Sequence, residues 1–160
     1  MNPQDLLERL ALQAHPEGGY YRETYRARQP VSRNGREYAA STAIYYLLCD
    51  GAYSAWHRIG SDETWHFYAG ATLLVHELQA DGTLLTHRLD DKLDGSSFQA
   101  TVQAGNWFAA ELEDPAAFAL VGCTVAPGFE FSEFELADGA ALLVHHADHE
   151  ALIRRLSAKR

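Results

Sequence analysis

The chain has 160 residues, 47% of them hydrophobic, and carries a formal net charge of −9 at pH 7. A chain of this length is typical of one domain with a substantial core, so we expect a single domain over residues 1–160. The negative charge disfavours nucleic acid or an anionic membrane surface as a partner, because both would repel the molecule as a whole.

The beginning of the chain predicts a short helix over residues 3–13. Asn2, Pro3 and Asp5 are an N-cap, a first-turn proline and an acidic residue at the positive end of the helix. This stretch does not have the basic and uninterrupted apolar segments of a secretion signal. No apolar run in the chain is long enough to span a membrane. We therefore expect a soluble, cytoplasmic protein.

The middle of the chain predicts about ten strands. Three Trp, eight Tyr and seven Phe favour strands, and short apolar alternations are separated by turn residues. Asn34-Gly35 and Asp81-Gly82 are hairpin signals. Without a long crossover helix, the sheets should be mainly antiparallel. The expected strands cover about residues 20–28, 38–48, 52–59, 64–69, 72–78, 83–88, 98–103, 107–112, 118–125, 129–136 and 140–145.

The end of the chain predicts a second short helix over residues 148–158. Leu152 and Leu156 repeat at helical spacing, and basic residues including Lys159 lie at the negative end of the helix. The predicted architecture is all-β, with a barrel over residues 19–146 and short helices at both ends.

One segment has the spacing of an incomplete metal-binding motif. Gly51 is followed by His57, Ile59, Glu63 and Gly70. This spacing resembles the first motif of the cupin superfamily, in which a second His normally stands where this chain has Ile59.

A later stretch resembles the second cupin motif, Pro-x-Gly-x-x-His. Here Gln103 stands in place of the Pro and Phe108 in place of the His. Read together, four blocks resemble the functionally uncharacterised cupin family five, with an RmlC-like jelly roll, over about residues 12–137. These blocks are His15–Thr24, Ser41–Leu48, Trp56–Gly70 and Val121–Phe131.

The resemblance implies a double-stranded β-helix, in which two sheets roll into a barrel around a pocket. It also implies a homodimer, because cupins commonly exchange or pair edge strands, which protects unpaired backbone groups. It does not supply a substrate.

Strand alternation predicts which side chains of the motif face the pocket. If His57 points inward, Glu63, Trp65 and Phe67 should join it after the turn. His66 should then point outward, unless a bulge reverses the alternation.

The motif offers few metal ligands. Divalent metals usually take three or four protein ligands, and the matched positions supply only His57 and Glu63. We therefore expect no cofactor. The alternative is a divalent transition metal, Zn²⁺, Fe²⁺ or Mn²⁺, held by these two residues and completed by water, Gln103, Tyr45 or Glu17.

Without a metal, His57 and Glu63 are candidates for an acid/base pair. A nearby carboxylate raises the pKa of a His, and apolar burial raises that of a Glu. The leading hypothesis is a cupin that binds a small polar or sugar-like molecule and isomerises or epimerises it, similar in outline to the sugar-nucleotide epimerase branch. His57 would be the base, Glu63 its partner and a Tyr such as Tyr45 the acid. The expected ligand contacts are Trp65, Phe67, Phe108, Gln103 and Glu17.

Other interpretations remain open. One is a metal-dependent enzyme with a reduced ligand set. Another is a non-catalytic metabolite-binding module. A third is a fold that keeps a buried His–Glu hydrogen bond from an ancestral metal site. A basic cluster between Arg22 and Arg36 holds five of the 13 Lys and Arg residues. If this cluster reaches the barrel mouth, it favours anionic ligands. Otherwise its side chains belong to a strand and turn that face the solvent.

Overall fold

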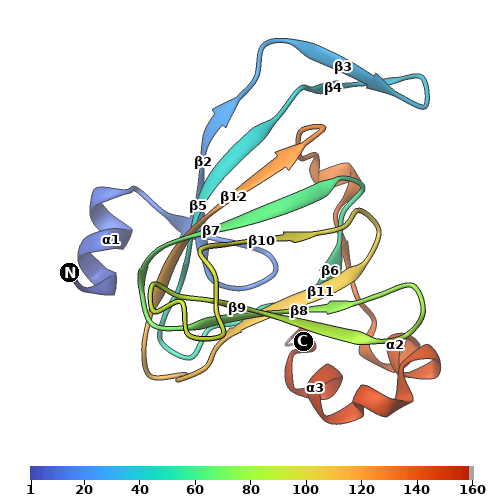
Figure 1. The fold of residues 1–160 in the computed structure, drawn as a ribbon. Helices are drawn as coiled ribbons and strands as arrows, with labels where there is room; N and C mark the ends of the chain where they lie inside the picture. The colour runs from blue at the N-terminus through green and yellow to red at the C-terminus, as the bar shows by residue number, and fades with distance from the viewer. Residues whose placement is uncertain (159–160) are drawn as a thin grey trace.

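The computed structural model describes residues 1–158, and its main feature is a pair of antiparallel sheets that face each other (Figure 1). The six-stranded sheet has the order β1 (Gln13–Ala14), β2 (Tyr20–Arg26), β5 (Thr42–Leu48), β12 (Ala119–Ala126), β7 (Asp62–Gly70) and β10 (Gln99–Val102). The five-stranded sheet has the order β13 (Glu135–Leu136), β6 (Ser54–Arg58), β11 (Trp107–Leu112), β8 (Leu73–Leu78) and β9 (Leu84–Leu89). The expected mainly β architecture is confirmed.

Short helices cover the ends of this sandwich. Helix α1 (Pro3–Arg9) packs through Leu6 against the outer side of the six-stranded sheet, at Leu47 and Leu120. Helices α2 (Gly139–His145) and α3 (Glu150–Arg155) pack on the other sheet around Trp56 and Ile153. The 3₁₀ turns η1 (Phe131–Glu133) and η2 (Ala147–His149) complete the C-terminal part. Among residues 1–158, no helix is long and apolar enough to cross a membrane.

The main core lies between the two sheets. It contains large side chains from both inner faces, including Trp65 and Phe67 from β7, Val75 from β8 and Phe108 from β11. Alternate residues of each strand supply these side chains, which is why the period-two pattern predicted the strands well.

The structure corrects several predicted elements. Residues 140–145 form helix α2 and not a strand, because the Asp138 side chain accepts hydrogen bonds from the backbone of Ala140 and Ala141 and caps a helix. Most of residues 129–136 form an irregular segment with η1, and only β13 is a strand. Helix α1 ends at Arg9, and β1 follows it to pair with β2.

The Asn34-Gly35 turn was expected to separate the strands at residues 20–28 and 38–48, but it joins two others. It connects β3 (Pro30–Arg33) to β4 (Arg36–Ala39), a separate hairpin that extends from the six-stranded sheet (Figure 1). Both turn residues have positive φ, which suits Asn-Gly in a two-residue hairpin. The predicted C-terminal helix consists of η2 followed by α3, and Lys159 lies outside the described residues.

Candidate functional site

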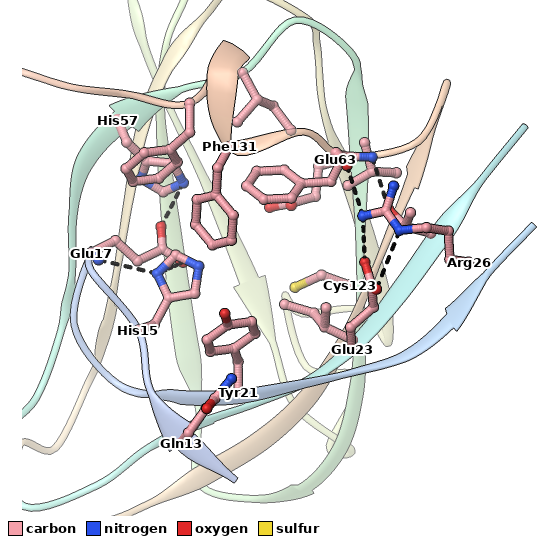
Figure 2. Close-up of a pocket in the computed structure, with 16 residues that line it drawn as sticks. Gln13, His15, Glu17, Tyr21, Glu23, Arg26, His57, Glu63, Cys123 and Phe131 are labelled. Atoms are coloured by element: carbon pink, nitrogen blue, oxygen red, sulfur yellow. Dashed lines mark hydrogen bonds and ion pairs between the residues drawn. The ribbon is translucent and has the colours of Figure 1, made fainter. Parts of the chain in front are cut away.

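A cavity of about 290 Å³ opens between the two sheets (Figure 2). It has room for on the order of ten water molecules. Its lining combines charged side chains with aromatic ones: Gln13, His15, Glu17, Tyr21, Glu23, Arg26, Thr42, Ile44, His57, Ile59, Glu63, Cys123, Val125, Phe129, Phe131 and Phe134. A concave wall that combines apolar and aromatic side chains with convergent polar groups is typical of a small-molecule site.

A buried ion pair between Glu17 and His57 forms one side of the cavity. Glu17 Oε2 lies 2.6 Å from His57 Nε2 and accepts a hydrogen bond of 2.9 Å from the Ser54 hydroxyl. The other ring nitrogen of His57, Nδ1, lies 2.7 Å from the carbonyl oxygen of Ala55. Both nitrogens of His57 are therefore engaged within the protein.

These contacts determine where the protons are. A carbonyl oxygen only accepts hydrogen bonds, so His57 Nδ1 must carry a proton, and the short contact with Glu17 requires another. Burial would lower the pKa of His57, but attraction to Glu17 and the hydrogen bond to it outweigh burial and raise that pKa. Burial would raise the pKa of Glu17, but His57 outweighs it and lowers that pKa. The pair is an imidazolium beside a carboxylate.

The backbone that presents Glu17 depends on the double glycine after it. Gly18 has φ +108°, and a methyl group there would lie 2.0 Å from the carbonyl oxygen of Tyr53. The Tyr46 hydroxyl donates a 2.5 Å hydrogen bond to the Gly18 carbonyl. The missing side chain at Gly18 thus allows a close approach to the neighbouring loop at Tyr53, which holds Glu17 against His57.

His15 lies next to this pair as a neutral ring. The backbone N–H of Glu17 donates to His15 Nδ1 at 3.0 Å, so the ring proton is on Nε2. Burial lowers the pKa of His15, although the charge of Glu17 opposes it. Among the described residues, Nε2 has no hydrogen-bond partner, which leaves an uncharged donor available to a ligand.

Glu63 is a second buried carboxyl group, and it is in the opposite state from Glu17. Burial, followed by the negative charge of Glu17, raises the pKa of Glu63 from 4.5 to about 8. Glu63 therefore keeps its proton at pH 7. Two carboxyl groups with opposite pKa shifts thus line a single cavity.

An aromatic wall, which we define as Phe129, Phe131 and Phe134, closes another side. The rings of Phe129 and Phe131 are 4.8 Å apart in an edge-on arrangement, and Phe131 remains 49% exposed at the opening. The segment that carries this wall has an irregular backbone. It is held to the sheet by a hydrogen bond that the backbone N–H of Phe129 donates to the Thr42 hydroxyl. An exposed ring at a cavity mouth is a stacking surface for a bound ring.

The structure brings three of the predicted site residues together: His57, Glu63 and Glu17 all line the cavity. However, the partner of His57 is Glu17 and not Glu63. Ile59 also faces the cavity, as alternation along the strand predicts.

Three predicted ligand contacts lie behind the lining instead of in it. Trp65, Phe67 and Phe108 are core residues. The Phe108 ring is 4.0 Å from the His57 ring, so it supports the site from the back.

Two other predicted residues lie elsewhere. Tyr45 points to the outer face of β5, where it packs with the α1 cluster, because its neighbour Tyr46 takes the inward position. Gln103 is exposed in the turn between β10 and β11, and its backbone N–H donates to Glu77. His66 points outward, as predicted, and lies 2.9 Å from the Thr124 hydroxyl.

Several lining residues were not predicted from the sequence. Tyr21 directs its hydroxyl into the cavity (Figure 2). Tyr21 and Glu23 are two positions apart on β2, so strand alternation places both side chains on the face that lines the cavity. His15 and Cys123 lie within the quoted family blocks without having been singled out. The aromatic wall was hidden because its segment was predicted as a strand.

The residues present do not fit a metal ion of the kind that cupin motifs bind. Both ring nitrogens of His57 are engaged, and Ile59 and Phe108 supply no donor at the other motif positions. Within residues 1–158, no group of three or more His, Cys, Asp or Glu side chains is arranged to hold a metal.

Comparison with known proteins agrees with this architecture. A hypothetical protein from Leishmania major is 31% identical over 99% of this chain and 100% of its own, with a TM-score of 0.90. A protein from Shewanella oneidensis is 35% identical over 100% of this chain and 99% of its own, with a TM-score of 0.91.

More distant likeness is limited to the fold. Oxalate decarboxylase from Bacillus subtilis is 14% identical over 92% of this chain and 37% of its own, with a TM-score of 0.57. A search of curated proteins finds no match. Residues 4–137 match the family described as Cupin superfamily (DUF985), which confirms the resemblance seen in the sequence motifs. The chain therefore belongs to this family of the cupin superfamily.

Proposed function

We propose that the cavity binds a small polar, sugar-like molecule and catalyses proton transfer on it, as a metal-independent isomerase or epimerase would. The observation that supports this most is that Glu17, His57 and Glu63 are buried around one aromatic cavity with their carboxyl groups in opposite protonation states. Environments that push the pKa values of neighbouring groups apart are how enzymes assign acid and base roles near neutral pH.

In this proposal Glu63 is the group that exchanges a proton with the ligand. Its pKa of about 8 lets it take up and release a proton near neutral pH, which is the range in which general acid–base catalysis is efficient. The Nε2–H of His15 and the hydroxyl of Tyr21 are positioned as uncharged donors to a ligand oxygen. A carbonyl bound there would make a neighbouring C–H bond acidic enough for the ionised form of Glu63, which is the minor form at pH 7, to remove its proton and become the neutral acid.

His57 has a different role from the one its motif position suggests. A base needs a free nitrogen, and both of its nitrogens are engaged with Ala55 and Glu17. We therefore assign His57 as a positioning residue that keeps Glu17 ionised. The negative charge of Glu17 in turn contributes to the raised pKa of Glu63.

The proposal is tested by exchange of ligand hydrogen for deuterium. Ligands are first found by thermal shift, because a compound that binds only the folded chain raises its stability. Each is then incubated with the protein in D₂O, and deuterium at carbons next to a carbonyl is followed by NMR. We expect exchange in the wild type, at a rate that rises with pH through about 8, and its loss in Glu63→Gln with retained ligand stabilisation.

Two results would contradict this assignment. Equal exchange in Glu63→Gln and the wild type would remove Glu63 as the proton-transfer group. Ligands that stabilise the chain without any exchange would instead support a non-catalytic binding module.

A further inference from the structure

The charged groups that line the cavity are paired with one another. His57 is bound to Glu17 on one side, and Arg26 is bound to Glu23 on the other (Figure 2). Each pair brings one positive and one negative charge together. A ligand that enters between them therefore meets no uncompensated charge of either sign.

Arg26 is the one guanidinium group among the lining residues, and its hydrogen-bonding capacity is nearly used. Its Nε and Nη2 donate to the two Glu23 oxygens at 3.3 and 2.7 Å, Nη2 also donates to the Phe129 carbonyl at 3.0 Å, and Nη1 donates to Glu130 at 3.3 Å. A guanidinium has five N–H donors, so four are engaged. Two carboxylates compete with any anion that approaches the fifth.

Other arginines of the basic cluster are occupied outside the cavity. Arg33 donates to both oxygens of Glu133 and to the Gly60 carbonyl. Arg36 donates to Ser132. These contacts tie the β3–β4 hairpin to the segment that carries the aromatic wall. This part of the cluster thus holds a wall of the pocket and does not supply positive charge inside it.

The groups left for a ligand are uncharged. They are the Glu63 carboxyl group, the Nε2–H of His15 and the Tyr21 hydroxyl. The Trp65 side chain is a hydrogen-bond donor to Glu63, which leaves the proton of that carboxyl group for a ligand. The His15 Nε2–H and the Tyr21 hydroxyl have no hydrogen-bond partner among residues 1–158. Phe131, whose ring centroid lies 6.0 Å from that of His15, offers a half-exposed ring face beside them. Uncharged donors next to an aromatic surface match a ring that bears hydroxyl or carbonyl groups.

We propose that the ligand is an uncharged, ring-containing polar molecule, of the class of free sugars and cyclic polyols, and not a phosphorylated or nucleotide-linked one. This inference rests on the proposed function for the location of the site, and it narrows the substrate class. An anionic ligand would have to displace Glu23 or Glu130 from Arg26, or be buried without a positive partner, which is costly.

The direct test compares matched neutral and phosphorylated ligands. Thermal shift and calorimetric titration are carried out on the full chain with a panel of aldohexoses and cyclic polyols, their monophosphates, and inorganic phosphate. We expect the neutral set to bind, and inorganic phosphate to bind far more weakly. Binding of a monophosphate at least tenfold more tightly than its neutral parent would overturn the proposal.

A charge-release variant provides a second measurement that does not require the right sugar. Glu23→Gln combined with Glu130→Gln removes both carboxylates from Arg26. We expect this variant to bind inorganic phosphate about 10- to 100-fold more tightly than the wild type, because charge-assisted hydrogen bonds become available. Glu135→Gln is the matched control, since it removes an exposed carboxylate from Arg58 outside the cavity.

The outcomes separate this inference from the proposed function. No gain in phosphate affinity on charge release, or a gain equal to that of Glu135→Gln, would refute the account of paired charges. A gain that disappears on adding Arg26→Gln supports it. If neutral ligands bind without deuterium exchange, the ligand class stands and the catalytic proposal fails; if a phosphorylated ligand binds more tightly and is exchanged, the reverse holds.

Discussion

Replacing Glu63 by Gln should make the folded chain more stable at high pH. Glu63 has a pKa of about 8 in the folded chain and about 4.5 when exposed. Between these values the unfolded chain loses a proton that the folded chain keeps. Raising the pH through this window therefore favours the unfolded state, and the stability of the wild type falls.

The size of the effect follows from the two pKa values. One unit of difference corresponds to about 1.4 kcal/mol, so Glu63 costs the fold about 3 kcal/mol at pH 7 and about 5 kcal/mol at pH 9. Below pH 4.5 the carboxyl group is protonated in both states, and the cost disappears. Gln has a similar shape and no charge, so Glu63→Gln removes the cost while keeping the volume.

The assay is urea unfolding of both proteins at pH 5, 7 and 9. We expect the variant to gain stability over the wild type by an amount that grows with pH, and little gain at pH 5. Glu130→Gln is the control, because Glu130 lies in an exposed pair with Arg26 and should show no such trend. A stability difference that stays constant from pH 5 to 9 would refute the reasoning, because it would mean that Glu63 is ionised in the folded chain.

Three further substitutions test other parts of the site. His57→Ala should destabilise the fold by about 3–5 kcal/mol in urea unfolding, because it leaves the Glu17 carboxylate buried without its partner; a loss below about 1 kcal/mol would argue against a buried ion pair. Phe131→Ala should weaken ligand binding several-fold in calorimetry while leaving the melting temperature within a few degrees, since the ring is half exposed; unchanged affinity would remove the stacking role. Gly18→Ala should cost at least about 2 kcal/mol, because the backbone has positive φ and the new methyl group would meet a carbonyl oxygen. Gly122→Ala is its counterpart, with a clash only against the exposed Tyr68 ring, and should cost less; equal losses would show that the Gly18 contact is not rigid.

Local patterns predicted the strands that bury alternate side chains. Strand β11 (Trp107–Leu112) matches its predicted range, and β7 brings Glu63 and Trp65 to the inner face as alternation requires. The outward direction of His66 follows from the same rule. These features depend on neighbours along one strand, so the sequence contains the information.

The segments after β12 were harder to predict. The stretch at 129–136 is rich in aromatic residues and resembles a strand, yet its backbone bonds go to η1 and to Thr42. Helix α2 was not predicted either, because over seven residues its apolar positions fit the period of a helix as well as that of a strand.

Sequence motifs were enough to predict the family, the two-sheet barrel and a pocket that includes His57, Glu17 and Glu63. They were enough because motif spacing and alternation are properties of short segments. The pairing of His57 with Glu17, which comes from a loop 40 positions earlier in the chain, and the retained proton of Glu63 became visible in the folded structure. Protonation depends on burial and on charges brought together from distant segments, and no local pattern records those distances.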